Sequence, residues 1–371
     1  MMEALKRLYA GFRGFDEAGS AVPMMDGPLK PNTALDEAPV VLRLPEIDNL
    51  TTTPGGLIGS QGAGLLRFRT SGASLEATEE RSFSSAITCL ASDASGGLAI
   101  GLDGQGIVVR GGRHDGLHIT TLNGVTLRSP SAALFLDPDM LIVANGSAEF
   151  MMADWKRDLM NRRATGGIWR VALTGNGGHE AIPLARDLAF PYGLAIGSGG
   201  ALLAAEAWRH RILTLDPSTA KAPRAVLADL PAYPARIAPA TSGGYWLSLF
   251  APRNQLVEFV LREEDYRRRM VASIDPAYWI APSLSSGASF LEPIQGGARK
   301  KLNMLKPWSP SWSYGLVVRC DANMRPLASF HSRADGALHG VTSLAESRGA
   351  LFVGVKGAGA IVRLQESGAP Q

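Results

Sequence analysis

The sequence contains a degenerate repeat of short apolar strands joined by tight turns. Each copy has an apolar strand, a turn that usually contains Gly or Asp, a second apolar strand, a polar turn and a third strand. The step between copies is 43 residues from Thr88 to Ser131 and 44 residues from Tyr192 to Arg236. Antiparallel strands that repeat roughly every 40 to 50 residues are typical of β-propeller blades. The clear copies begin at Ile87, Ser131, Tyr192, Arg236 and His339.

The spacing of the copies predicts six blades, although seven would also fit the length. The gap between Arg236 and His339 has room for two steps with insertions, and a weaker start, YGLVVRCD, falls inside it at Tyr314. We expect the N-terminal stretches VVLRLPEIDN and GLLRFRT to supply strands that close the ring, because closure removes exposed sheet edges. The predicted fold is an all-β, six-bladed propeller with short helical insertions. Residues 41–371 would form this single domain, and residues 1–40 would be an N-terminal extension.

Composition agrees with many short strands in one folded domain. Hydrophobic residues make up 46% and charged residues 19%, so a large core can be buried. The 42 glycines and 23 prolines favour frequent turns. The formal net charge is only +3, and no basic tract interleaved with aromatic residues occurs, so we expect no nucleic-acid partner.

Neither the cysteines nor the apolar runs indicate a secreted or membrane protein. Cys89 and Cys320 are not at a metal-binding spacing, and we expect two reduced, buried thiols, with one isolated disulfide as the alternative. No run reaches the 18 or so apolar residues that would cross a bilayer. The N-terminus lacks the apolar stretch of a signal peptide, since Arg13, Asp16 and Glu17 interrupt it. The expected location is the cytoplasm.

Two insertions interrupt the repeat. Residues 149–163 have the spacing of a short amphipathic helix, with Met152, Trp155, Leu159 and Met160 on one stripe. Residues 256–274 suggest a strand that continues into a charged helix. Either insertion could form a lid or a contact between subunits, or could simply pack on the rim.

Several stretches resemble the strictosidine synthase-like branch of the gluconolactonase/paraoxonase superfamily. PYGLAI, LLAAEAWRHRILTLD, LPAYPARI and GGYWLSLFAPRN are similar to the branch's PNG element, its AE-W-HRI strand, its YPDN element and its GG-W-LA strand. GSAEFMMADWKRDLMNRRATGGIWRV and HSRADGALHGVTSLAE resemble two further blades. The likeness is strongest over residues 131–371.

This resemblance implies a six-bladed propeller with a pocket at one end of its central channel. Many members hold a divalent cation there, usually calcium, through side chains at the starts of the innermost strands. In hydrolytic members the cation polarises a lactone or ester carbonyl and helps to activate water. Plant strictosidine synthases instead use a glutamate to condense an amine with an aldehyde, and that position aligns with His339 here.

The acidic and amide ligands of the family are replaced in this sequence. Their positions map to Thr88, Ser131, Tyr192 and the pair Ala235–Arg236. Calcium prefers several oxygen ligands, and an arginine in the channel would repel it. We therefore expect no cofactor and no metal, with calcium returning if the mapping is off by one residue.

The same mapping brings a set of polar residues to the channel. His339 would act as general acid or base. Arg236 would clamp an anion or stabilise an oxyanion, and Tyr192 would donate a hydrogen bond to the same oxygen. The residues expected to orient substrate or water are Thr88, Ser131 and Tyr314. The alternative is that all of these side chains fill and hydrogen-bond the channel without chemistry.

Other polar residues favour structural roles. Glu206, Trp208, Arg209 and His210 lie in a blade strand and its turn, where an internal ion pair with aromatic packing is expected. GGLAIGLDGQG lies in a strand–turn–strand repeat rather than before a helix, so its glycines indicate turns and not a phosphate cradle. No G-x-S-x-G nucleophile elbow occurs.

Three functions follow as hypotheses. The first is a metal-independent hydrolase or lactonase that acts on a small anionic or carbonyl-bearing substrate. The second is a propeller that binds a small molecule or a protein partner without turnover. The third is condensation chemistry of the strictosidine synthase type. The partners expected are a small molecule and, through residues 149–163 or 256–274, a second subunit.

Overall fold

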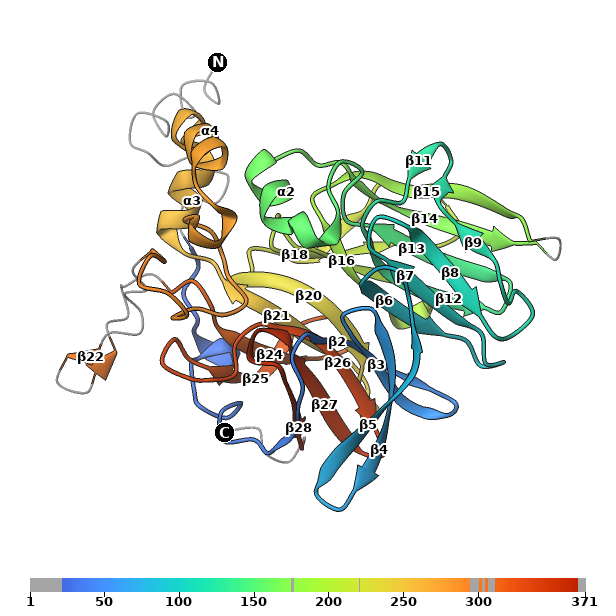
Figure 1. The fold of residues 1–371 in the computed structure, drawn as a ribbon, viewed down its shortest axis with the longest axis horizontal. Helices are drawn as coiled ribbons and strands as arrows, with labels where there is room; N and C mark the ends of the chain where they lie inside the picture. The colour runs from blue at the N-terminus through green and yellow to red at the C-terminus, as the bar shows by residue number, and fades with distance from the viewer. Residues whose placement is uncertain are drawn as a thin grey trace.

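Six four-stranded antiparallel sheets surround a central channel, as the repeat predicts (Figure 1). The computed structural model describes residues 22–174, 177–219, 221–293, 300–301, 304–305 and 311–365. The first 21 residues of the expected extension lie outside these ranges. The inner strand of each blade contacts the inner strand of the next, which completes the ring. The prediction of a six-bladed propeller is confirmed.

The strands of each blade follow in chain order from the channel outward, and in the last blade the outermost strand comes from the N-terminus. The first blade consists of β2 (Ile47–Thr53), β3 (Gly56–Gln61), β4 (Gly64–Ser71) and β5 (Ser74–Ser82), and the second of β6 (Ile87–Ser92), β7 (Leu98–Leu102), β8 (Gly106–Arg110) and β9 (His118–Ile119). The third consists of β12 (Pro130–Asp137), β13 (Met140–Asn145), β14 (Gly166–Leu173) and β15 (His179–Leu188), and the fourth of β16 (Pro191–Ile196), β17 (Leu202–Glu206), β18 (Arg211–Leu215) and β19 (Arg224–Leu227). The fifth consists of β20 (Ala232–Pro239), β21 (Tyr245–Pro252), β24 (Gly315–Cys320) and β25 (Pro326–Ser332), and the sixth of β26 (Val341–Ser347), β27 (Ala350–Val355), β28 (Ala360–Leu364) and β1 (Val40–Arg43). Two short ribbons, β10 (Thr121–Leu122) with β11 (Val125–Thr126) and β22 (Lys300–Lys301) with β23 (Met304–Leu305), lie outside the blades.

An N-terminal strand closes the ring. β1 pairs antiparallel with β28, with Val40 opposite Val362 and Arg43 opposite Ala360. The blade that follows it in the chain, β2 to β5, has all four strands. It takes the place in the count of six that the repeat spacing assigned to the segment at Tyr314. The weak start at Tyr314 is not an inner strand: it leads into β24, the third strand of the fifth blade. The count of six was therefore right, while the place of one blade was wrong.

The helical insertions lie on the same side of the ring in Figure 1. The 3-10 turn η2 (Met152–Asp154) and α2 (Trp155–Asn161) follow the predicted apolar stripe, and Leu159 and Met160 are buried. The segment expected to begin as a strand is helical instead, as α3 (Gln255–Arg262) and α4 (Glu264–Ser273). Asn254 explains the difference, because its side-chain oxygen accepts from the backbone N–H of Leu256 at 2.8 Å and so caps α3.

Apolar clusters fill the spaces between neighbouring blades, and small residues let the inner strands approach. A Cβ at Gly193 would lie 2.3 Å from the carbonyl oxygen of Ala235, so β16 and β20 can approach this closely only with glycine there. Cys89 and Cys320 are free and buried, as expected. No helix in the described ranges is long and apolar enough to cross a bilayer.

Candidate functional site

A cavity of about 260 Å³ opens at the channel end where the inner strands begin, beside η2 and α2. This is slightly below the usual volume of small-molecule sites, about 300 to 1,000 Å³, so only a small ligand would fit. We call it the α2 cavity. Its walls are aromatic and aliphatic, with charged groups on two sides. The lining residues are Asp48, Ala86, Ile87, Thr88, Asp103, Met152, Ala153, Trp155, Phe190, Tyr192, Trp208, Phe250, Leu284 and Lys356.

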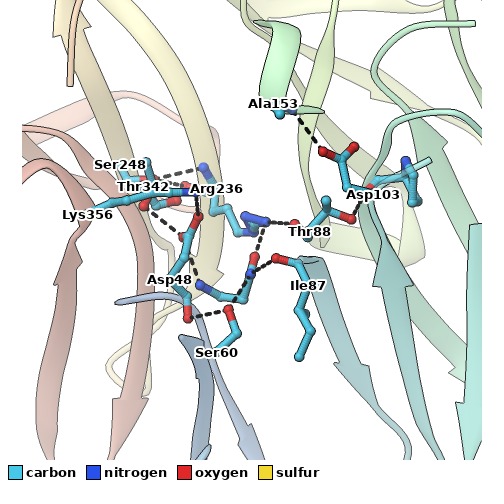
Figure 2. Close-up of polar contacts among 12 residues, drawn as sticks. Asp48, Ser60, Ile87, Thr88, Asp103, Ala153, Arg236, Ser248, Thr342 and Lys356 are labelled. Carbon is cyan, nitrogen blue, oxygen red and sulfur yellow. Dashed lines mark hydrogen bonds and ion pairs between the residues drawn. The ribbon is translucent and has the colours of Figure 1, made fainter. Parts of the chain in front are cut away.

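A buried ion pair lies at the first charged side. Asp48, near the start of β2, is 4% exposed, and its Oδ2 lies 3.1 Å from Nζ of Lys356, which follows β27 (Figure 2). Its Oδ1 accepts from Thr342 Oγ1 and from the backbone N–H of Asn49, both at 2.8 Å. Burial alone would raise the pKa of Asp48, but Lys356, Arg236 and these hydrogen bonds hold it below its ordinary value. The charge of Asp48 in turn raises the pKa of Lys356, so the amine stays protonated.

Arg236 lies directly behind this pair and crosses the channel. Its Nη2 donates to Oδ1 of Asn49 and to the carbonyl oxygen of Thr88, which belong to the first and second blades (Figure 2). Its guanidinium carbon lies 5.1 Å from the centre of the Tyr192 ring. Burial, with the nearby charge of Asp48, raises the pKa of the Tyr192 hydroxyl, which therefore remains a donor. No hydrogen bond joins that hydroxyl to another side chain in the described part of the chain.

Asp103 forms the second charged side, in the turn after β7. Its two oxygens accept from the backbone N–H groups of Met152 at 2.6 Å and Ala153 at 3.0 Å, so it anchors the first turn of η2 (Figure 2). Burial raises the pKa of Asp103, although these two hydrogen bonds and the charge of Lys356 work against the rise. A carboxylate with a raised pKa at a cavity wall is a candidate general base.

Aromatic rings form the remaining wall. Trp155 lies edge-on to Phe250 with ring centres 5.5 Å apart, and Phe190 stacks on Trp208 at 4.5 Å. The indole N–H of Trp208 donates to Asp158 of α2 at 2.7 Å, which ties the helix to the fourth blade. The wall is therefore rigid and apolar, and it faces the charged groups.

Three of the predicted site residues lie together. Thr88 and Tyr192 line the α2 cavity, and Arg236 contacts both. Ser131 lies elsewhere: its side chain donates to the carbonyl oxygen of Pro191 at 2.5 Å and links the third and fourth blades. It is fully buried and does not line the α2 cavity.

His339 and Tyr314 do not line the α2 cavity. Nδ1 of His339 lies 2.8 Å from Ser313 Oγ, and Nε2 lies 2.7 Å from the carbonyl oxygen of Arg333. That carbonyl can only accept, so Nε2 carries the proton and the serine donates to Nδ1. Burial lowers the pKa of His339. Tyr314 is buried, with its hydroxyl 3.1 Å from Nδ1 of His331.

The expected internal ion pair around Glu206 is present. Glu206 is fully buried, and its carboxylate contacts Arg209 at 2.8 Å and Arg211 at 2.5 Å. It also accepts from the backbone N–H of Ala189 at 2.7 Å. These bonds fix the turn between β17 and β18, which is a structural role.

Sequence reasoning missed three charged residues of the cavity: Asp48, Asp103 and Lys356. Asp48 stands in VVLRLPEIDN, which was expected to supply only closing strands. Asp103 stands in GLDGQG, where it has the pattern of an ordinary turn residue. Lys356 directly follows the apolar strand LFVGV, and this position at a strand end is the sequence signal that could have placed it at the cavity.

Solved structures of other proteins are similar to this chain over most of its length. A gluconolactonase from Xanthomonas campestris is similar with a TM-score of 0.55 and 14% identity, covering 94% of this chain and 98% of its own. A second protein, solved by structural genomics and described as of the gluconolactonase type, has a TM-score of 0.54 and 12% identity, covering 88% and 91%. These likenesses show the six-bladed propeller fold. No protein-family profile and no curated protein sequence matches the chain.

The sequence resemblance described above implies a divalent cation in the channel. Thr88 lies at the start of the second blade, and the first blade, to which the sequence mapping gave no ligand position, supplies an acid, Asp48. However, Lys356 faces Oδ2 of Asp48, and Arg236 faces Oδ1 of Asn49. Two fixed cations therefore occupy the oxygens that calcium would need. The described ranges hold no group of three or more His, Cys, Asp and Glu suited to a metal. These residues do not fit a calcium ion.

Proposed function

We propose that the protein is a lactonase-type hydrolase that opens a small cyclic ester in the α2 cavity, without a metal ion. The observation that carries this proposal is the placement of a protonated amine and a carboxylate of raised pKa at the same cavity. Lys356 and Asp103 both line it, and the charge of Lys356 acts on the pKa of Asp103. The likeness to gluconolactonases supports the reaction class through the fold only.

In the proposed reaction, Asp103 accepts a proton from a water molecule as the water oxygen attacks the carbonyl carbon of the lactone. The carbonyl oxygen becomes an oxyanion, which Lys356 and the Tyr192 hydroxyl stabilise by donating hydrogen bonds. The ring carbon–oxygen bond then breaks. Asp103 returns its proton to the departing alkoxide, and a hydroxy acid is released. Arg236 acts as a positioning residue, since it contacts the Tyr192 ring and the Thr88 carbonyl from behind.

The test is a pH-stat assay of five- and six-membered lactones with the wild type and Asp103→Asn. Loss of a general base lowers kcat by roughly 10² or more, and we expect this loss at a temperature where the variant, which keeps one of the two hydrogen bonds to η2, is still folded. The matched control is Asp154→Asn, which removes a neighbouring carboxylate of η2 that does not line the cavity. We expect it to keep most of the activity.

Other outcomes would identify the other hypotheses. Saturable lactone binding without hydrolysis would make the protein a binding propeller. Consumption of an amine and an aldehyde, with no lactone opening, would indicate condensation. Equal activity of Asp103→Asn and the wild type would refute the proposed base.

A further inference from the structure

A second cavity, of about 440 Å³, opens at the opposite end of the channel, where the inner strands end. We call it the far cavity. Every blade contributes to it, because its lining includes residues from all six inner strands. It shares no lining residue with the α2 cavity. Its volume lies within the range of small-molecule sites, which is about 300 to 1,000 Å³.

The wall of the far cavity is an aliphatic ring. One branched aliphatic residue comes from each blade: Leu50, Leu90, Leu134, Leu194, Ile237 and Leu344. In four blades the next residue is alanine, as in Leu90–Ala91 and Leu194–Ala195. Apolar side chains around an open space are suited to an apolar ligand and do not satisfy a polar one.

Arg236 supplies a cation at the inner end of this ring. It lines the far cavity and precedes Ile237 in β20. Its Nη2 has two neutral acceptors, but its Nη1 is buried without a hydrogen-bond partner. Asp48 interacts with Arg236 through its charge, but its oxygens are held by Lys356, Thr342 and the backbone N–H of Asn49, and within the described ranges no carboxylate contacts the guanidinium directly. A buried donor without an acceptor is costly, so Nη1 favours an acceptor oxygen, and the charge of the guanidinium favours an anionic one.

One acid, Glu346, also lines the far cavity, at the opposite end from Arg236. Glu346 lies two residues beyond Leu344, towards the mouth. Its Oε2 accepts from the indole N–H of Trp246 at 3.1 Å and from the backbone N–H of Thr241 at 3.0 Å. The cavity therefore has a cation at its inner end, an aliphatic middle and a polar mouth.

We propose that the far cavity binds an amphipathic carboxylate, such as a medium-chain fatty acid. Its carboxylate lies against Arg236 and its chain lies within the aliphatic ring. The two cavities share no lining residue, although Arg236 also positions Tyr192 in the proposed lactonase site, so binding to the far cavity is measured separately from lactone hydrolysis.

Isothermal titration calorimetry with three ligands that share one chain tests the proposal. We expect decanoate to bind saturably at one site, decan-1-ol to bind at least about tenfold more weakly, and decyltrimethylammonium to give no binding heat. The loss of a charge-assisted hydrogen bond supports a difference of this size. Equal binding of decanoate and decan-1-ol, or no saturable binding of decanoate, would overturn the proposal.

Variants locate the binding. Arg236→Met replaces the guanidinium with an unbranched apolar side chain and should weaken decanoate binding about tenfold or more. Arg236→Lys keeps the charge and should bind decanoate more tightly than Arg236→Met. Ala133→Phe, at a half-buried position of the lining, should weaken both decanoate and decan-1-ol. Asp103→Asn changes only the α2 cavity and should bind decanoate as the wild type does. Wild-type affinity in both Arg236→Met and Ala133→Phe would refute the site, whatever the lactone assay shows.

Discussion

Asp48→Asn should destabilise the propeller because it removes the negative partner of a buried pair. The amide keeps the shape of the side chain and can still accept from Thr342 and from the backbone N–H of Asn49. What it loses is the charge that faces Lys356 at 3.1 Å, with Arg236 close behind. Two cations then remain near each other without a carboxylate.

The magnitude follows from the burial of the two partners. Removing one partner of a buried ion pair lowers the free energy of unfolding by about 3 to 5 kcal/mol. The side chain of Lys356 is 34% exposed and can reach water, so we take the lower end, about 3 kcal/mol. Unfolding entropy of about 2.1 cal/mol/K per residue over 371 residues converts this into a fall of about 4 °C in the thermal midpoint.

The assay is urea unfolding of the wild type and Asp48→Asn between pH 3 and pH 7. The folded pKa of Asp48 is lowered, so its contribution is complete above the unfolded value near 4 and is lost as the pH falls through the folded pKa. The difference between the two proteins should therefore be largest at pH 7 and should shrink below about pH 4. A difference under about 0.5 kcal/mol at pH 7, or one that stays constant down to pH 3, would refute the reasoning.

A double-mutant cycle with Lys356→Met isolates the pair from other effects of each substitution. We expect the double variant to lose less free energy of unfolding than the two single variants lose together, by roughly 1 to 3 kcal/mol. Additive losses would show that the two side chains do not interact.

Three further predictions concern the α2 cavity and its surroundings. Trp155→Ala should raise KM for a lactone substrate about tenfold with a smaller change in kcat, because it removes part of the aromatic wall, and a result in which only kcat falls would contradict that role. The value of kcat/KM should fall on the acid side as the pH drops through the raised pKa of Asp103, and should stay flat on the basic side past neutrality, since the pKa values of Tyr192 and Lys356 are raised. His339→Ala should lower the free energy of unfolding by about 2 to 3 kcal/mol, because Ser313 and the Arg333 carbonyl lose their partner, while KM stays the same; a changed KM with unchanged stability would return His339 to the site.

The fold could be predicted because the blades repeat a local pattern. Strand starts such as Ile87 and Tyr192 follow turns and begin with alternating apolar residues, so the inner strands are visible without knowledge of the whole. Tyr314 was misplaced for the same reason, because a third strand has the same pattern as an inner strand. A long insertion between β21 and β24 removed the spacing that would have distinguished them.

The candidate site could be predicted only in part. Thr88 and Tyr192 lie near the starts of inner strands and Arg236 lies in the middle of one, and an inner-strand position brings all three to the channel. Lys356 and Asp103 lie after second strands, and their role depends on contacts with segments distant in the sequence. Asp103, for example, reaches the cavity wall through hydrogen bonds to an insertion about 50 residues later. Periodicity carries no information about such contacts.

The most direct test of the proposed mechanism is the rate of lactone hydrolysis by the wild type and by Lys356→Met, both measured in excess chelator. The account predicts that the wild type keeps its full rate without divalent ions, and that Lys356→Met loses roughly 10² or more in kcat because the oxyanion loses its charged donor. A wild type that needs added calcium for activity, or a Lys356→Met variant as active as the wild type, would contradict it.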